Sequence, residues 1–210
     1  ASHYLSELCR NHGYGAEKHA GAILRVGKYD CPVDPARIDS VNRFLEYVYD
    51  IGGEQFVELL VRYTHYVKNG FGTSDHIAVV ADTLHVVDFK DGEGVQVWAK
   101  RCEQLMLYAL GWLQEYGWLY PEVKKVVLHI AQPRLNHFDK WDTTVEDVLA
   151  FGAEARAAEQ LAESPNAPFV PGEWCSNNFC KIRATCKARA EHAAKIALDN
   201  FEGFDNLDIF

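Results

Sequence analysis

Two acidic residues and a lysine have the spacing of a divalent-metal site near the middle of the chain. Asp75 begins one expected strand and Asp88 ends the next, where the sequence reads HVVDFKDG. Asp88 and Lys90 project from the same face because side chains alternate along a strand. In a hairpin the start of one strand lies beside the end of the other, so the two carboxylates can converge. Taken alone, Asp88 and Lys90 are better explained as a surface ion pair.

With Asp75 included, the pattern suits Mg²⁺ or Mn²⁺. A hard cation takes one or two carboxylates, a backbone carbonyl and waters, and Phe89 is placed to offer the carbonyl. The metal would polarise a scissile phosphate and lower the pKa of a bound water. Lys90 would orient or help deprotonate that water and offset developing charge. The expected reaction is phosphodiester hydrolysis without a covalent intermediate.

Polar side chains that could hold a substrate follow these strands. Residues 97–116 show the periodicity of an amphipathic helix, and Gln104 and Tyr108 share one face of it because they are one turn apart. Arg101 is expected one turn earlier on that face. Arg134 follows a later expected strand, and guanidinium groups suit bidentate phosphate contacts. The alternatives are that Tyr108 is a core residue and that Arg134 is a loop-surface charge.

The elements that position these residues predict an α/β fold. Hydrophobic periodicity indicates helices over 3–10, 36–51, 97–116, 143–162 and 183–198, and strands over 56–68, 74–81, 84–90 and 124–132. Three adjacent strands followed by a helix and another strand favour a mixed sheet. A linker over 164–174, with three prolines and a glycine, separates an expected domain 1–163 from a small cysteine-containing appendage over 175–210.

Composition narrows the class of protein. The chain has 210 residues and a net charge of −9, which argues against a protein that coats nucleic acid indiscriminately but not against a nuclease. No apolar run approaches the roughly 20 residues that a membrane span needs, and no signal peptide is visible, so we expect a cytoplasmic protein. The first residue is Ala1 rather than an initiator methionine, and we expect that further residues precede it.

Three of the six cysteines lie close together, as Cys175-x4-Cys180-x5-Cys186. Free or buried thiols are the plain alternative. Three cysteines at short spacing beside a linker favour ligation, because thiolates suit Zn²⁺ or an iron–sulfur cluster.

The combined motifs resemble RecB-type nucleases of the PD-(D/E)XK superfamily. That family has a histidine-containing first helix, two acids followed by a lysine, and a Gln-x-x-x-Tyr helix. The matching stretches are ASHYLSE, GFGTSDHI, VVDFKDG and Gln104-x-x-x-Tyr108, while QPRLNHFDKW and FCKIRATCKARAE resemble a phage-encoded branch of RecB-like exonucleases. The resemblance implies a restriction-endonuclease-like core, with a central mixed sheet flanked by helices.

The resemblance also implies the roles of particular residues. His3, Asp75, Asp88 and the Phe89 carbonyl would hold Mg²⁺ or Mn²⁺, and Lys90 would position the hydrolytic water. The residues expected to bind the substrate are Arg101, Gln104, Tyr108 and Arg134. The expected activity is that of a DNA exonuclease in phage recombination or processing, acting on DNA with a free end in the host cytoplasm, with a single-strand annealing protein as an expected partner.

For the cysteines, the resemblance implies a [4Fe–4S] cluster. Related nucleases place three cysteines at the C-terminus as C-x2-C-x5-C and a fourth upstream of the histidine motif. Here the second interval matches, while the first has two extra residues. The fourth cysteine would precede Ala1. Cys9, Cys31 and Cys102 are alternative ligands, although packing is the better explanation for Cys102.

Some interpretations stay open at this point. Glu58 could lie on the strand before Asp75 and take part in the site. His76 and His85 border the site, and we expect them to be exposed strand histidines. Two other functions compete with the exonuclease: a catalytically silent DNA-binding or assembly module with a structural iron–sulfur or zinc site, and a redox or metal-sensing protein.

Overall fold

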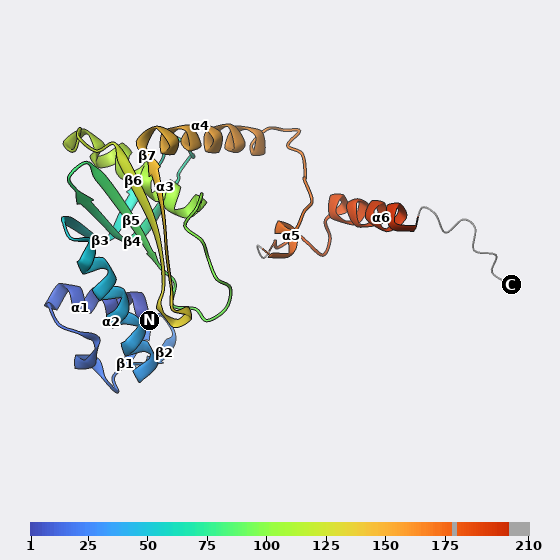
Figure 1. Ribbon diagram of the computed structural model, residues 1–210. Coiled ribbons are helices and arrows are strands. Elements are labelled where there is room, and N and C mark those ends of the chain that lie inside the picture. The colour runs from blue at the N-terminus through green and yellow to red at the C-terminus, as the bar shows by residue number, and fades with distance from the viewer. Residues whose placement is uncertain (178–179, 202–210) are drawn as a thin grey trace. The chain divides into compact units, whose positions relative to one another are not determined.

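The computed structural model describes residues 1–177 and 180–201 (Figure 1). The chain divides into two compact units, Ala1–Glu159 and Gln160–Phe210, which are described separately. In the described ranges, no helix combines the length and the apolar character needed to cross a membrane.

The first unit is built on a mixed sheet of five strands in the order β3-β4-β5-β6-β7. The strands are β3 (Glu54–Arg62), β4 (Phe71–Val80), β5 (Thr83–Phe89), β6 (Lys125–Gln132) and β7 (His137–Thr144). Strands β5 and β6 are parallel, and the other neighbours are antiparallel. The predicted α/β class with a central mixed sheet is confirmed, and the arrangement is compatible with a restriction-endonuclease-like core.

Helices α1 (Ser2–His12) and α2 (Pro35–Ile51) lie side by side and pack on one face of the sheet (Figure 1). The Asp34 side chain caps α2 by accepting a hydrogen bond from the Arg37 N–H, and Pro35 suits the first helical position. The ring of Phe44 on α2 stacks on Phe89 of β5 with centroids 4.3 Å apart. This core therefore seats α2 beside the end of β5 that carries the predicted site.

Helix α3 (Glu103–Tyr116) forms the second core with α4 (Val145–Ala162). Trp112 is fully buried there, among apolar residues of β3 to β6. Gly111 allows close packing on β3, because a Cβ added to it would lie 2.8 Å from the Val61 Cβ. Since α3 crosses from β5 to β6, its first turns lie next to the end of β5.

Three strands were not predicted from the sequence. Strands β1 (Ile23–Val26) and β2 (Tyr29–Pro32) form a separate antiparallel hairpin. The third is β7, whose sequence HFDKWDTT is too polar to indicate a strand but pairs along its whole length with β6. Short 3₁₀ helices connect the elements: η1 (Ala16–His19), η2 (Gly117–Leu119) and η3 (Pro133–Leu135).

The predicted helix over 97–116 begins six residues too early. The Val97 N–H donates to Gln132 Oε1 at 2.7 Å, and the Ala99 N–H donates to Asp139 Oδ2 at 2.8 Å. These contacts tie residues 97–99 to β6 and β7, and Arg101 has a positive φ of 52°, which a right-handed helix does not allow. Helix α3 then starts at Glu103.

In the second unit, the described elements are α5 (Trp174–Asn177) and α6 (Lys187–Phe201). The helix expected over 183–198 therefore begins four residues later. Within the appendage predicted over 175–210, residues 178–179 and 202–210 lie outside the described residues.

Candidate functional site

The two predicted acids face each other beside the end of β5. Asp75 lies in the middle of β4, which already begins at Phe71, so the prediction that Asp75 begins its strand was wrong. The antiparallel register pairs Ile77 with Val86 and His76 with Val87, so its continuation by one residue sets Asp75 opposite Asp88. Asp75 Oδ2 accepts a hydrogen bond from the Phe89 N–H at 2.7 Å. The fold thus brings together two carboxylates that are separated in the sequence by the β4–β5 turn.

Asp88 is 3% exposed and lies in a polar network with α3. Gln104 Nε2 donates to Asp88 Oδ1 at 2.9 Å and to the Tyr108 hydroxyl at 2.9 Å. Lys90 Nζ lies 2.8 Å from Asp88 Oδ2 and donates to Gln104 Oε1 at 3.0 Å. Four of the predicted catalytic and substrate-binding residues are therefore joined directly, because the start of α3 packs over the end of β5.

His3 reaches the same place from α1. Its Nε2 donates to the Phe89 carbonyl at 2.8 Å and lies 3.6 Å from Asp75 Oδ1. Three of the four predicted metal ligands thus meet on the α1 side of the site. The neighbouring Asp75 carboxylate is the main cause that raises the pKa of the His3 imidazole.

Burial and neighbouring charges shift the pKa values of Asp88 and Lys90. Burial, and then the neighbouring charge of Asp75, raise the pKa of Asp88. Burial alone would lower the pKa of Lys90, but the carboxylates of Asp88 and Asp75 outweigh it and the pKa is raised. Lys90 is therefore held as an ammonium ion.

The donors at this site fit a hard divalent cation in their chemistry. Within the described part of the chain, no three His, Cys, Asp or Glu side chains are arranged to hold a metal ion, because Asp88 points to Lys90 and Gln104 while Asp75 points to His3 and Phe89. Asp88 Oδ2 is buried against the Lys90 ammonium at 2.8 Å, and a carboxylate oxygen keeps a second lone pair that a cation could use beside that contact. The repulsion between Asp75 and Asp88 would also be relieved by positive charge.

A cavity of about 330 Å³ adjoins these residues. It is lined by His3, Phe89, Lys90, Asp91, Gly92, Gly94, Val95, Val97 and Gln132. Its size is at the lower end of the range for small-molecule sites, which is about 300–1,000 Å³. Three of the predicted site residues, His3, Phe89 and Lys90, thus border a space that a small group such as a nucleotide could enter.

Comparison with known proteins gives a family but not an activity. The family model described as "Protein of unknown function (DUF2800)" matches residues 39–209. The chain belongs to the DUF2800 family. A solved structure described as "Crystal structure of SSO0001" is similar to it at 18% identity with a TM-score of 0.36, over 70% of this chain and 66% of that one, which is just under two thirds of its length.

The DUF2800 match includes every predicted site residue except His3, since α1 precedes residue 39. Two arginines predicted to bind substrate lie in ion pairs in this structure. Arg134 is 16% exposed and contacts Asp91 and Glu93, while the exposed Arg101 pairs with Glu154 at 3.4 Å. Arg101 also precedes α3 with a positive φ of 52°, so its placement on the face of Gln104 was wrong. Its contact with substrate stays a prediction, as does that of Arg134.

Two further residues lie at the site: Arg10, which was not assigned from the sequence, and Glu58, whose participation the sequence left open. Arg10 on α1 donates to the Asp75 carbonyl at 3.2 Å and contacts the His76 ring. Glu58 stands opposite Asp75 in the β3–β4 register, at a positive φ of 46°. Burial, followed by the charge of Asp75, raises the pKa of Glu58 to about 7. A signal for Arg10 was present in the sequence, because it lies two helical turns after His3.

The histidines behind the site differ from expectation. His76 is fully buried rather than exposed, and burial is the main reason that its pKa is lowered to about 3. His85 Nδ1 lies 3.0 Å from His129 Nε2, and Tyr47 bonds the other nitrogen of His129 at 2.8 Å. The alternation of β4 turns His76 toward α1, where Arg10 meets it, and sequence reasoning could not place that helix.

The three C-terminal cysteines line one cavity of the second unit, of about 250 Å³. Cys175, Cys180 and Cys186 are partly buried and free. Three thiols around one cavity fit an iron–sulfur cluster in their donor chemistry. Of the alternative ligands in the first unit, Cys9 is fully buried in the α1–α2 core and Cys102 precedes α3 and packs against the other core. Packing accounts for both.

Proposed function

We propose that this DUF2800 protein is a metal-dependent DNA exonuclease. The observation that supports the proposal most is the network at the end of β5. There a buried carboxylate lies opposite a second carboxylate and contacts a charged lysine and a glutamine–tyrosine pair from α3, and the lysine borders a cavity. Such convergence of charged and polar groups with perturbed pKa values beside a cavity is typical of a functional site.

In this proposal, Asp75, Asp88, His3 and the Phe89 carbonyl would hold Mg²⁺ or Mn²⁺. The bound metal supplies Lewis-acid activation of the phosphate and a water of lowered pKa. Lys90 orients the attacking water and offsets negative charge developing on the phosphate. It does so as a cation, because its raised pKa makes it a poor base at neutral pH.

In this proposal, helix α3 positions the catalytic residues. Gln104 holds Asp88 with its amide N–H and Lys90 with its carbonyl, so one side chain fixes both partners. Tyr108 keeps Gln104 in that orientation and presents its hydroxyl on the same side. The substrate phosphate would approach from the cavity beside Lys90. Arg101 and Arg134 would contact the DNA strand only after leaving their carboxylate partners.

The cysteine unit completes the proposal. Cys175, Cys180 and Cys186 would hold a [4Fe–4S] cluster with a fourth ligand that the described residues do not identify. In the wider proposal the protein works on phage DNA with a free end, beside a single-strand annealing protein. An iron–sulfur cluster in such a nuclease would be structural, since phosphodiester hydrolysis transfers no electrons.

The test is degradation of linear DNA by the full-length protein with Mn²⁺, using strands labelled at either the 5′ or the 3′ end. Asp88→Ala and Lys90→Ala should each abolish cleavage. The matched controls are Asp82→Ala and Lys125→Ala, which break an ion pair of 3.0 Å near the opposite end of β5 and should leave cleavage unchanged. Full activity in Asp88→Ala and Lys90→Ala, or no cleavage by the unmodified protein, would reject the proposal.

A catalytically silent DNA-binding or assembly module is the second candidate. It is favoured by one observation: Asp75 and Asp88 already have partners within the chain. The same experiment separates the two, because a silent module would retain labelled DNA in a binding assay and release no nucleotides from it.

A further inference from the structure

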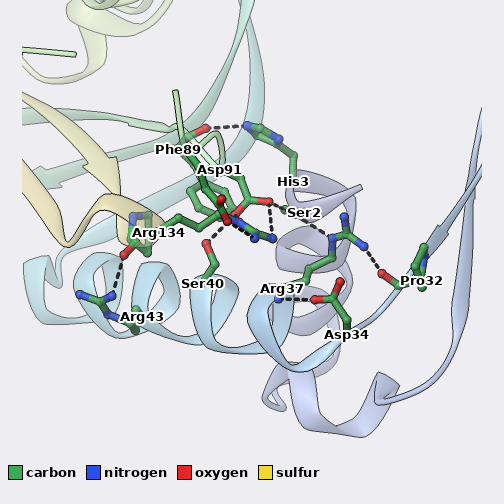
Figure 2. A network of polar contacts seen from close by, with 12 residues as sticks. Ser2, His3, Pro32, Asp34, Arg37, Ser40, Arg43, Phe89, Asp91 and Arg134 are labelled. Carbon is green, nitrogen blue, oxygen red and sulfur yellow. Dashed lines mark hydrogen bonds and ion pairs between the residues drawn. The ribbon is translucent and has the colours of Figure 1, made fainter. Parts of the chain in front are cut away.

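Asp91 lies at the centre of a buried polar network that sequence reasoning did not identify. Its carboxylate accepts hydrogen bonds from Ser2 and Ser40, the latter at 2.5 Å, and from Arg134 Nε at 2.8 Å (Figure 2). Asp91 and Arg134 are only 15% and 16% exposed. Asp91, Ser2, Ser40 and Arg134 are called the Asp91 network below.

The Asp91 network joins four segments that are distant in the sequence. Ser2 belongs to the first turn of α1, Ser40 to α2, and Arg134 to η3 after β6. Asp91 itself follows β5 by two residues. A single carboxylate therefore ties both helices of one layer to the ends of two neighbouring strands.

The part of α1 held in this way is the part that carries His3. Ser2 contacts Asp91, and the next residue, His3, contacts the Phe89 carbonyl (Figure 2). Arg37 Nε donates to Ser2 Oγ at 3.1 Å, so the hydroxyl is fixed from two sides. The opposite end of α1 is anchored independently, by the buried side chain of Cys9 and by Arg10.

We propose that Asp91 is a positioning residue that fixes the first turn of α1, and through it His3, at the metal-binding end of β5. The role of His3 as a metal ligand rests on the proposed function, whereas the anchoring of α1 by Asp91 does not depend on it. Without the Asp91 carboxylate, Ser2, Ser40 and Arg134 lose their common acceptor, and the first turn of α1 is released. The contact of Asp88 with Gln104 runs to α3 and its contact with Lys90 stays within the end of β5, so both persist.

The contacts also give Arg134 an anchoring role. All three of its guanidinium nitrogens face carboxylates: Nε and Nη2 face Asp91, and Nη1 faces Glu93. A paired, largely buried guanidinium is costly to separate from its partner. Holding Asp91 in place explains this arrangement directly, whereas a phosphate-binding role would require both contacts to break.

The experiment measures Mn²⁺ binding by calorimetry and amide exchange of α1 in the full-length protein. Loss of an outer residue that orients a ligand typically weakens metal binding about 10–100-fold. We expect Asp91→Ala to weaken Mn²⁺ binding by a factor in that range, and to speed exchange in the first two turns of α1 at least about tenfold, as expected when a local anchor is lost. Asp82→Ala, the control near the start of β5, should change neither.

A double substitution tests whether Asp91 acts through His3. If it does, Asp91→Ala combined with His3→Ala should bind Mn²⁺ no more weakly than His3→Ala alone. Additive losses in the double variant, or wild-type exchange of α1 in Asp91→Ala, would overturn the inference. If Asp91→Ala folds poorly, Asp91→Asn replaces it, because asparagine keeps the size and one acceptor oxygen. Its Mn²⁺ affinity should lie between those of the unmodified protein and His3→Ala.

The outcomes separate the two proposals. If the unmodified protein neither binds Mn²⁺ nor cleaves DNA, the proposed function fails, while exchange of α1 in Asp91→Ala still decides whether Asp91 anchors the helix. If the protein cleaves DNA and Asp91→Ala binds Mn²⁺ like the unmodified protein, only the positioning role is rejected.

Discussion

Gln104 is the residue whose removal should most clearly reveal the polar network at the end of β5. Gln104→Ala deletes the amide that donates to Asp88 and Tyr108 and accepts from Lys90. Alanine suits the helix, so any loss must come from these contacts rather than from helix propensity. The substitution is therefore a direct measure of what the network contributes to stability.

The magnitude follows from the burial of Asp88. Its carboxylate is 3% exposed and cannot recover the lost hydrogen bond from bulk water. A buried polar group left without its partner costs about 1–3 kcal/mol. For a domain of this size each kcal/mol lowers Tm by about 2–4 °C, so we expect a decrease of about 2–12 °C.

The assay is thermal and urea unfolding of Gln104→Ala beside Gln114→Ala. Gln114 lies on the same helix and makes hydrogen bonds with His65 and Thr64 at the protein surface. Water can replace those contacts, so Gln114→Ala should lower the free energy of unfolding by less than about 1 kcal/mol. Equal losses in the two variants would show that the network around Asp88 adds no stability, and the reasoning would be refuted.

Two further predictions concern the rest of the first unit. His129 is buried neutral, and burial is the main cause that lowers its pKa to about 3, so the unfolded chain binds more protons between that value and the ordinary 6.5. Stability should therefore fall as pH drops below about 6.5, and urea midpoints of His129→Gln should depend less on pH between 7 and 5; an unchanged slope would contradict this. Gly111→Ala should lower the free energy of unfolding by about 1–3 kcal/mol, because the new Cβ would meet Val61 at 2.8 Å. In Gly117→Ala the nearest atom is 3.7 Å away, so this control should be neutral or slightly stabilising, and equal losses in both would rule out the packing explanation.

Much of the fold follows from local patterns. The apolar periodicity of 36–51 and the alternating strands around Asp75 and Asp88 fixed helices and strands to within a few residues of α2, β4 and β5. Such patterns are readable because each element buries one face, and its side chains repeat with its own period.

Other elements depended on partners elsewhere in the chain. Strand β7 has a polar sequence and forms because β6 offers it a complete antiparallel ladder. Residues 97–101 have a helical pattern, but Gln132 and Asp139 hold the start of this segment against β6 and β7. The positive φ of Arg101 then delays the helix. No local window of the sequence contains that competition.

For the site, too, the sequence predicted one part and the tertiary structure decided another. The sequence by itself predicted that Asp75, Asp88, Lys90 and Gln104 would lie together, because residue type and spacing along one hairpin and one helix limit where these side chains can be. Only the tertiary structure decided that Asp91 ties α1 and α2 to the end of β5, since hydrogen bonds across tens of residues leave no periodic trace in the sequence. Packing of distant segments against one carboxylate is what converts a motif into a positioned site.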